Sequence, residues 1–246
     1  MLDSAAAMRT REERDPRAVR AMFGGIARRY DLLNHLLSLN LDRRWRRRAA
    51  AELAPAAGET ILDLCGGTGD LAMAVARQAP GATVVCGDFS HPMLKLAAGK
   101  FARAGAAGCL LVEADALALP LRAGSMDGIT VGFGIRNLAD LDAGLREILR
   151  VLRPGGRLVL LEFSTPGGPV LSRVYRAYLH RLLPRVGDRA SGASGPYGYL
   201  ARTIAAWPDA PTLAGRIREA GFDGVGWLHL SGGIVAVHTA LKGGGG

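Results

Sequence analysis

The stretch from Thr60 to Asp70, T-I-L-D-L-C-G-G-T-G-D, constrains the fold more than any other part of the chain. Its apolar start is typical of a buried parallel strand, which breaks at once into Gly66, Gly67 and Gly69. A helical pattern follows from Leu71 to Gln78. This unit suits the adenosine end of a cofactor, because glycines let the backbone approach a ligand and a helix start offers free N–H groups.

The acids of this stretch narrow the choice of cofactor. The spacing G-G-T-G lacks the third glycine of the dinucleotide fingerprint, while Asp63 precedes the turn and Asp70 closes it. Carboxylates repel a pyrophosphate but suit a sulfonium and an amino group. The segment therefore resembles the E/D-x-x-x-G-x-G turn of S-adenosylmethionine-dependent methyltransferases. A glycine-rich turn of some other α/β protein is the alternative that this segment alone leaves open.

Six further strands are expected after this unit, with helices between most of them. The predicted strands are 82–86, 109–112, 125–131, 157–163, 224–230 and 234–241, and the predicted helices are 93–103, 141–152 and 212–220. The order predicts an α/β fold: a doubly wound, mostly parallel seven-stranded sheet with an antiparallel finish, Rossmann-like, preceded by N-terminal helices. The ligand is expected at the carboxyl ends of the strands.

The 246 residues suit a single domain, predicted over 16–242. Within it, 16–54 is predicted to form a helical lid and 164–203, rich in Gly, Pro and Arg, a substrate-cover insertion containing a helix near 171–183. Residues 1–15 are expected to form a mobile arm and 243–246 a glycine tail.

Composition excludes several classes of protein. No apolar run reaches the ~18 residues of a membrane span, and the N-terminus lacks the apolar centre of a signal peptide, so a soluble, cytoplasmic protein is expected. Cys65, Cys86 and Cys109 form no C-x-x-C pair, which predicts buried, inert thiols and no metal site.

The net charge of +9 is concentrated near the N-terminus, where residues 1–48 hold twelve arginines and six acids. Leucines from Leu32 to Leu39 and the arginines around Trp45 suggest an amphipathic helix. Its arginines are expected to contact an anionic membrane surface, nucleic acid or only solvent. Its leucines are expected either to face a bilayer or to pack on the sheet.

Several segments together resemble the ubiquinone/menaquinone biosynthesis C-methyltransferases, over about residues 17 to 242. These segments are Tyr30-Asp31-Leu32-Leu33-Asn34, Arg44-Trp45-Arg46, Gly134-Ile135-Arg136-Asn137, Arg150 to Gly156, Leu161 to Ser164, Tyr197 to Leu200 and Gly232 to His238. The resemblance implies methyl transfer from S-adenosylmethionine to a ring carbon of a demethylated polyprenyl quinol.

Cofactor-binding positions follow from chain order and from the resemblance. Asp88, with Phe89 beside it, ends the second strand about 20 residues beyond the glycine turn, where a carboxylate holds a ribose diol. The family pattern adds Thr68 and the adenine loop at Asp115–Ala116. Gly132 stands where the family often has serine, and binding there is expected to lack one side-chain hydrogen bond.

Catalysis by such an enzyme requires a quinol oxygen that can become negative and a ring aimed at the methyl group. Arg136 is predicted to stabilise that oxygen and Asn137 to orient the ring. Tyr30 and Asn34 are predicted to reach the site from the lid, where Asp31 or His35 would relay the proton.

Structural alternatives stand beside these roles. Arg136 would instead pair with an acid such as Asp140, and Tyr30 would only pack. Glu162 would edge the pocket or pair with an arginine, and His238 is more often a satisfied core histidine.

A menaquinone-type naphthoquinol is the favoured substrate, and a ubiquinone-type benzoquinol, another small phenol or lipid, and RNA are the alternatives. G-F-G-I-R-N stands where an amine-directed nucleic-acid enzyme has [DNS]-P-P-[YFW], so no nucleic-acid partner is expected. A cofactor-binding protein without methyl transfer is a second rival, which the intact motifs disfavour. Contact with the inner face of the cytoplasmic membrane is expected, and a homo-oligomer is left open.

Overall fold

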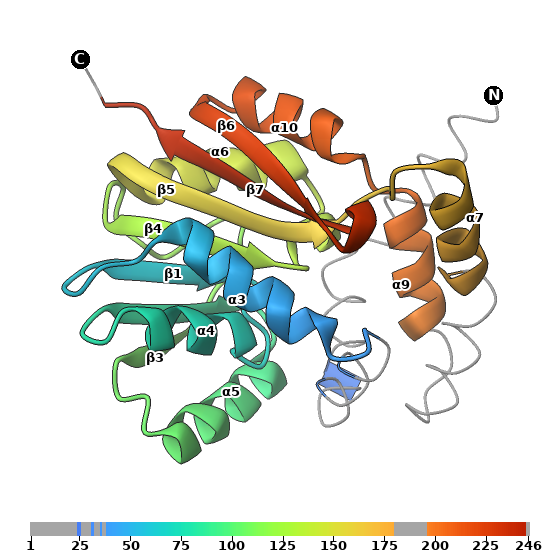
Figure 1. Cartoon of the computed structure of the whole chain (residues 1–246). Coiled ribbons are helices and arrows are strands. Elements are labelled where there is room, and N and C mark those ends of the chain that lie inside the picture. The colour runs from blue at the N-terminus through green and yellow to red at the C-terminus, as the bar shows by residue number, and fades with distance from the viewer. Residues whose placement is uncertain (1–23, 26–30, 32–34, 36–37, 180–195, 245–246) are drawn as a thin grey trace.

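The computed structural model describes residues 24–25, 31, 35, 38–179 and 196–244. Within them the strands form a seven-stranded sheet in the order β3-β2-β1-β4-β5-β7-β6 (Figure 1). The strands are β1 (Thr60–Leu64), β2 (Thr83–Asp88), β3 (Cys109–Glu113), β4 (Met126–Gly132), β5 (Leu152–Phe163), β6 (Phe222–Leu230) and β7 (Val235–Lys242).

Strands β1 to β5 run parallel to one another, whereas β7 is antiparallel to both of its neighbours, β5 and β6. The chain leaves β1 toward β2 and β3, then returns to the other side of β1 with β4. The predicted doubly wound, mostly parallel sheet is confirmed. Its switch point lies between β1 and β4, where such folds hold their ligands.

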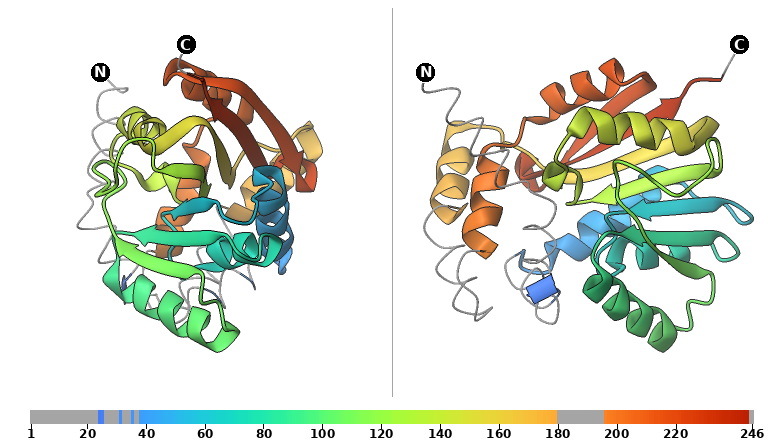
Figure 2. Two further views of the ribbon diagram at one scale, coloured as in Figure 1. Left: turned by 90° about the vertical axis from the view of Figure 1, so that its left-hand side faces the viewer. Right: turned by 180° about the vertical axis from the view of Figure 1, so that it is seen from behind.

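Helices cover both faces of the sheet (Figures 1 and 2). One face carries α3 (Leu41–Leu53), α4 (Asp70–Gln78) and α5 (His91–Ala104), and the other carries α6 (Leu141–Val151) and α10 (Ala210–Glu219). Strand β5 shows why: Leu158 and Leu160 pack with α6 and α10, while Val159 and Leu161 pack with α3 and α4. Alternate side chains of a strand point to opposite faces, so a strand covered on both sides is apolar throughout.

The observed limits of most elements differ from the predicted ones by only a few residues, but β5 starts earlier. The sequence predicts a helix up to Leu152, a tight turn at 154–156 and a strand from Arg157. In the structure Leu152 already pairs with Met126 of β4, and a register shift then brings Arg157 opposite Gly128. Cross-strand pairing, which local pattern cannot reveal, sets this limit.

The predicted cover insertion contains two described helices, α7 (Pro169–Ala177) and α9 (Pro196–Ala205), which lie side by side at one end of the sheet (Figures 1 and 2). The helix predicted near 171–183 is α7, which begins two residues earlier, at a proline suited to a first helical turn. Its predicted end lies outside the described residues, as does much of the predicted lid before α3: residues 16–23, 26–30, 32–34 and 36–37. No helix in the described part of the chain is long and apolar enough to span a membrane.

Candidate active site

A pocket opens at the carboxyl ends of β1, β2 and β4, with an empty volume of about 780 Å³ that is partly open to solvent. The sheet register places Leu64 beside Gly87 and Val131, so the turns that follow these three strands are neighbours. Residues predicted from the sequence line much of it: Gly67, Asp88, Phe89, Asp115, Ala116, Gly132 and Asn137. Apolar residues that the sequence did not single out complete the lining, among them Leu64, Met93, Leu117 and Leu138.

Asp88 is held rigidly at the end of β2. One carboxylate oxygen accepts a hydrogen bond of 2.9 Å from the Gly67 N–H and the other accepts one of 2.8 Å from the Ser90 N–H. Gly67 has a φ of 56°, and nothing lies within 4 Å of the position a Cβ would take. The turn therefore presents bare backbone to the pocket beside a fixed carboxylate, as an adenosine-binding turn requires.

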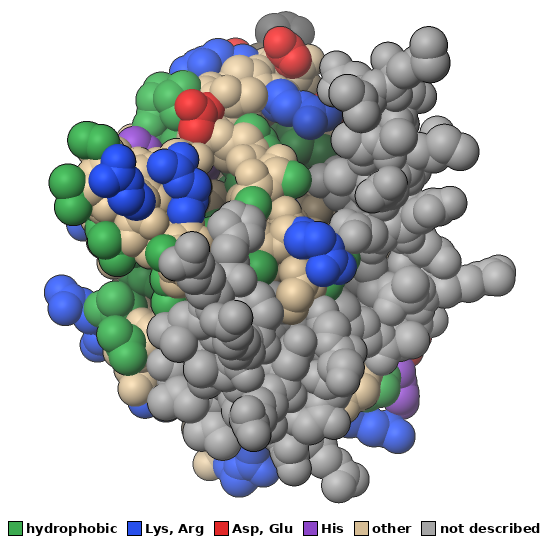
Figure 3. Space-filling model, turned by 90° about the vertical axis from the view of Figure 1, so that its right-hand side faces the viewer, with side chains coloured by type: hydrophobic (Ala, Val, Ile, Leu, Met, Phe, Trp, Pro, Cys, Tyr) green, Lys and Arg blue, Asp and Glu red, His purple; other side chains and the backbone are tan. Residues whose placement is uncertain are grey.

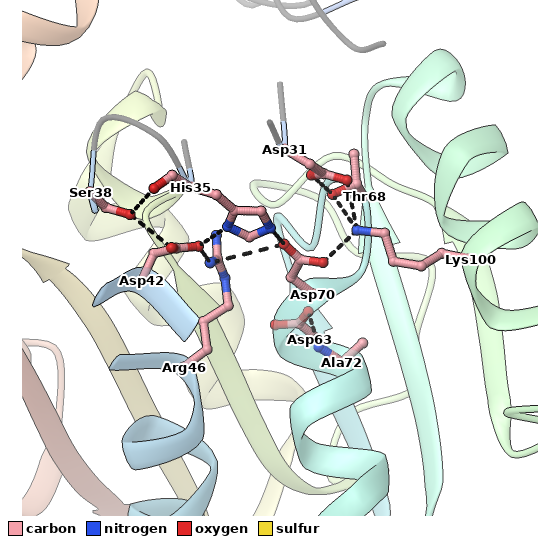
Figure 4. Close-up of polar contacts among 10 residues, drawn as sticks. All are labelled: Asp31, His35, Ser38, Asp42, Arg46, Asp63, Thr68, Asp70, Ala72 and Lys100. Carbon is pink, nitrogen blue, oxygen red and sulfur yellow. Dashed lines mark hydrogen bonds and ion pairs between the residues drawn. The ribbon is translucent and has the colours of Figure 1, made fainter. Parts of the chain in front are cut away.

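Asp63 has a different place from the one its motif suggests, because its carboxyl group does not line the pocket. The residue is fully buried, and its oxygens accept hydrogen bonds from the Ala72 N–H at 2.9 Å and the Thr130 hydroxyl at 2.8 Å. Ala72 lies in the first turn of α4, whose N-cap, Gly69, has no side chain to offer (Figure 4). Asp63 thus caps α4 from strand β1. Burial raises the pKa of this carboxyl to about 7.

The turn after β1 and the turn after β4 are packed against each other. A Cβ added at Gly134 would lie 2.3 Å from the Cβ of Cys65. Cys65 and Phe133, both on the pocket wall, have positive φ values of 55° and 58°. Strained backbone of this kind persists only where the surrounding packing enforces it, and it is frequent at functional sites.

Arg136 is buried behind the pocket wall rather than exposed in it. Its Nη1 donates a hydrogen bond of 2.8 Å to Glu162 and another to the Phe133 carbonyl. The ion pair weighed as an alternative is therefore present, with Glu162 as partner in place of Asp140, which caps α6 through the Ala143 N–H. Burial raises the pKa of the Glu162 carboxyl, and the guanidinium opposes that shift.

Asn137 lies on the pocket wall and ties it to the cover helices. Its Oδ1 accepts a hydrogen bond of 3.1 Å from the Tyr199 hydroxyl of α9. Sequence reasoning noted Tyr199 only as part of a family segment and gave it no role. Tyr175 of α7 is buried, and its hydroxyl has no hydrogen-bond partner among the described residues.

Thr68 is not part of the pocket lining. Its side chain contacts Asp31 of the N-terminal segment (Figure 4). Its hydroxyl donates to Asp31 and accepts a hydrogen bond of 3.1 Å from Lys100 of α5. Lys100 also forms ion pairs with Asp31, at 2.8 Å, and with Asp70. The described part of the predicted lid is therefore bound directly to the glycine turn.

A second set of contacts continues this network (Figure 4). His35 Nδ1 lies 2.7 Å from Asp42, which also pairs with Arg46 and accepts a hydrogen bond of 2.7 Å from the Ser38 hydroxyl. His35, Asp42 and Asp70 offer ligand-type atoms within 4.8 Å of one another. We assign no metal there, because Arg46 and Lys100 already neutralise the two carboxylates.

The other predicted residues have mixed outcomes. Gly66 and Gly69 shape the turn without lining the pocket, and Tyr30 and Asn34 lie outside the described residues. All three cysteines are free, but only Cys86 is buried, so the prediction of buried thiols is wrong for Cys65 and Cys109, which are partly exposed. Partial or full burial raises the pKa of each thiol. His238 is a buried core residue whose Nε2 lies 3.0 Å from the Ala210 carbonyl, in keeping with the structural alternative.

Comparison with known sequences gives matches along almost the whole chain. The profile of the ubiE/COQ5 methyltransferase family matches residues 8–242. The chain is 46% identical over 232 residues to the demethylmenaquinone methyltransferase of Mycolicibacterium vanbaalenii, covering 94% of this chain and 97% of that one. It is 45% identical over 230 residues to the protein of the same name from Corynebacterium kroppenstedtii, covering 94% and 96%.

Solved structures share the fold at low sequence identity. The [4+2]-cyclase SpnF superimposes with a TM-score of 0.63 at 20% identity, over 82% of this chain and 81% of that one. A SAM-dependent methyltransferase from Aquifex aeolicus gives 0.59 at 16% identity, over 80% and 88%. These likenesses show the fold alone, since one fold carries many chemistries.

Proposed function

The chain belongs to the ubiE/COQ5 methyltransferase family, and on that premise we propose that it transfers a methyl group from S-adenosylmethionine to a ring carbon of demethylmenaquinol, giving menaquinol. The observation that carries this proposal is the 46% identity, over nearly full length, with a protein named for that reaction. The pocket supports it, because its polar and apolar parts suit the methyl donor.

The residues present fit S-adenosylmethionine. The open backbone at Gly67 leaves room for the methionine part, and the fixed Asp88 carboxylate suits two hydroxyls of a ribose. Asp115 and Ala116 border the same pocket, where a carboxylate accepts an exocyclic amine and a small side chain leaves room for a flat ring. When bound, S-adenosylmethionine supplies an electrophilic methyl group carried on a sulfonium sulfur.

In this proposal the chain's own residues orient the quinol and stabilise its oxygen. Loss of a hydroxyl proton from the quinol raises electron density on the ortho carbon. The methyl group would pass to that carbon as its bond to sulfur breaks, and the ring would regain its aromaticity by releasing the proton of the same carbon. The Asn137 Oδ1 accepts a hydrogen bond from Tyr199, which fixes the orientation of the amide. The amide N–H groups of Asn137 can then donate to the quinol oxygen.

Arg136 supports this site from behind the pocket wall. Its Nη1 holds the Phe133 carbonyl, which belongs to the wall next to Asn137. Its pairing with Glu162 fixes the guanidinium in place while reducing its net charge. We therefore expect Arg136 to contribute by positioning the wall more than by bare charge.

The lid and the location of the enzyme complete the proposal. The part of the predicted lid that precedes α3 would close over the pocket, held to the glycine turn through Asp31 and Lys100, whereas α3 itself packs on the sheet. The substrate carries a polyprenyl tail that resides in the bilayer, so the protein would work in the cytoplasm at the inner face of the cytoplasmic membrane. The proposed chemistry requires no metal.

Substrate choice is tested with methyl-labelled S-adenosylmethionine and three acceptors: reduced demethylmenaquinone, the reduced benzoquinol precursor and bulk RNA. The proposal predicts label in the naphthoquinol. Label only in the benzoquinol would change the assigned substrate from a naphthoquinol to a benzoquinol and leave C-methylation as the reaction. Label only in RNA would overturn the proposal.

Variants test the two assigned roles. Asn137→Ala is expected to lower kcat about 100-fold, as removal of an oxyanion donor does, with little change in binding of S-adenosylmethionine. Arg136→Lys keeps the charge but loses the guanidinium that holds both Glu162 and the Phe133 carbonyl, so a comparable loss is expected. Wild-type rates in both variants would remove these residues from the mechanism.

A further inference from the structure

Helix α7 has one inward anchor and otherwise faces outward. Its sequence is P-V-L-S-R-V-Y-R-A, and Tyr175 is its buried residue. Tyr175 packs with Leu179 and with Ala201 and Ile204 of α9. The inner side of α7 is thus fixed to the other cover helix, beside the candidate active site.

The outer side of α7 exposes apolar side chains to solvent. Val170 is 75% exposed, Val174 is 61% exposed and Leu171 is 36% exposed. Val170 and Val174 are four residues apart, so they lie on one face of the helix. Scattered exposed apolar residues are ordinary, but three on one short helix form a surface that favours a less polar environment than water.

Positive charge surrounds these side chains. Arg173 and Arg176 are exposed on the same helix, and residues 164–179 and 196–205, the described parts of the insertion, contain no Asp or Glu. Figure 3 shows hydrophobic and basic side chains side by side at its upper left, the side on which α7 lies. An apolar face flanked by two arginines that have no ion pair among the described residues matches the interface of an anionic bilayer.

The edge of α7 rests on the turn between β6 and β7. Leu171 lies against Gly232, where an added Cβ would come within 2.6 Å of it. Ser231, the preceding residue in that turn, accepts a hydrogen bond of 2.9 Å from Trp45 of α3. The turn therefore holds α7 against the rest of the domain, with Val170 and Val174 directed away from it.

We propose that α7 docks this protein on an anionic lipid bilayer, the apolar side chains entering the interface and Arg173 and Arg176 meeting the headgroups. The proposal rests on the proposed function for its purpose, since docking would bring the pocket to a lipid-borne quinol. It moves the expected membrane contact, placed by the sequence on residues 32–48, chiefly to α7. The charge of Arg173 and Arg176 and the exposure of Val170 and Val174 support membrane docking whether or not the protein is a methyltransferase.

Vesicle co-sedimentation of the full chain without substrate tests the proposal. The vesicles are phosphatidylcholine alone, or phosphatidylcholine with phosphatidylglycerol. The variants are Val170→Glu/Val174→Glu and Arg173→Gln/Arg176→Gln, and Leu110→Glu is the matched control, because Leu110 is 53% exposed on edge strand β3.

Wild type and Leu110→Glu are expected to bind the anionic vesicles alike. Each arginine removed is expected to weaken binding about fivefold, and so the arginine pair roughly 25-fold. The two glutamates are expected to weaken binding more than about tenfold. Binding of either double variant within about twofold of wild type would overturn the proposal, as would a wild type that binds no vesicle.

Two further readouts separate the remaining explanations. A dimer in solution that Val170→Glu/Val174→Glu dissociates would overturn the proposal, because it would assign the face to a second copy of the chain. Methyl transfer to a water-soluble, short-chain demethylmenaquinol is expected to be unchanged in both double variants. If wild type did not methylate this soluble quinol, the proposed function would be refuted. The vesicle experiment would still test membrane docking separately.

Discussion

Replacing Asp63 tests whether this residue caps α4 across the sheet. In Asp63→Ala the Ala72 N–H and the Thr130 hydroxyl both lose their buried acceptor. Each orphaned polar group costs about 1–3 kcal/mol, so the free energy of unfolding is expected to fall by roughly 4 kcal/mol. For a chain of this size that loss corresponds to a decrease in Tm of about 8–16 °C.

Asp63→Asn is the matched control. Its amide oxygen can still accept from the Ala72 N–H, and its amide N–H can donate to the Thr130 oxygen. Below pH ~4, where the Asp63 carboxyl is neutral, a loss of about 1 kcal/mol relative to wild type is therefore expected. Thermal and urea unfolding followed by circular dichroism measure both variants. An Asp63→Ala protein within about 1 kcal/mol of wild type would refute the capping role.

The same pair predicts a pH dependence. The carboxyl pKa is about 7 in the folded state and about 3.9 in the unfolded state, so between these values only the folded state keeps the proton. Wild-type stability relative to Asp63→Asn is therefore fully present below pH ~4 and lost as pH rises through ~7, by roughly 4 kcal/mol in total. A difference that stays constant over this range would contradict the raised pKa.

Three other predictions concern the pocket and its walls. Gly134→Ala is expected to lower stability by about 1–3 kcal/mol, because the new methyl collides with Cys65; an unchanged Tm would show that the two turns can separate. Asp88→Ala is expected to weaken S-adenosylmethionine binding at least about tenfold by calorimetry, since one charge-assisted hydrogen bond contributes about 1.5–3 kcal/mol; equal affinity would remove Asp88 from the site. The Cys86 thiol, buried and with a raised pKa, is expected to react with a disulfide reagent only on unfolding, and rapid labelling of the native protein at that residue would contradict its burial.

The local sequence pattern predicts the sheet and much of the pocket lining correctly. The strand–glycine–helix unit and the acid at the end of β2 are contiguous signals, and parallel pairing brings their carboxyl ends together. For this reason the sequence predicts Gly67 and Asp88 at the pocket, and the family resemblance adds the 115–116 loop; all of them line it in the structure.

What sequence reasoning missed depends on contacts between distant residues. Asp63 looks like a ligand-binding acid until Thr130, on the neighbouring strand, is seen to share its carboxylate. Ion pairs were expected as alternatives for Arg136 and for Glu162, but not with each other, because their segments are adjacent only through the register of β4 and β5. The exposure of Val170 depends likewise on which side of α7 faces α9.

The most direct test of the proposed reaction locates the transferred methyl group. The protein is incubated with reduced demethylmenaquinone and S-adenosylmethionine carrying a deuterated methyl group, and the product is analysed by mass spectrometry and NMR. The account predicts one deuterated methyl group on the ring carbon beside a quinol hydroxyl. A deuterated methyl group on oxygen, or no labelled quinol at all, would contradict it.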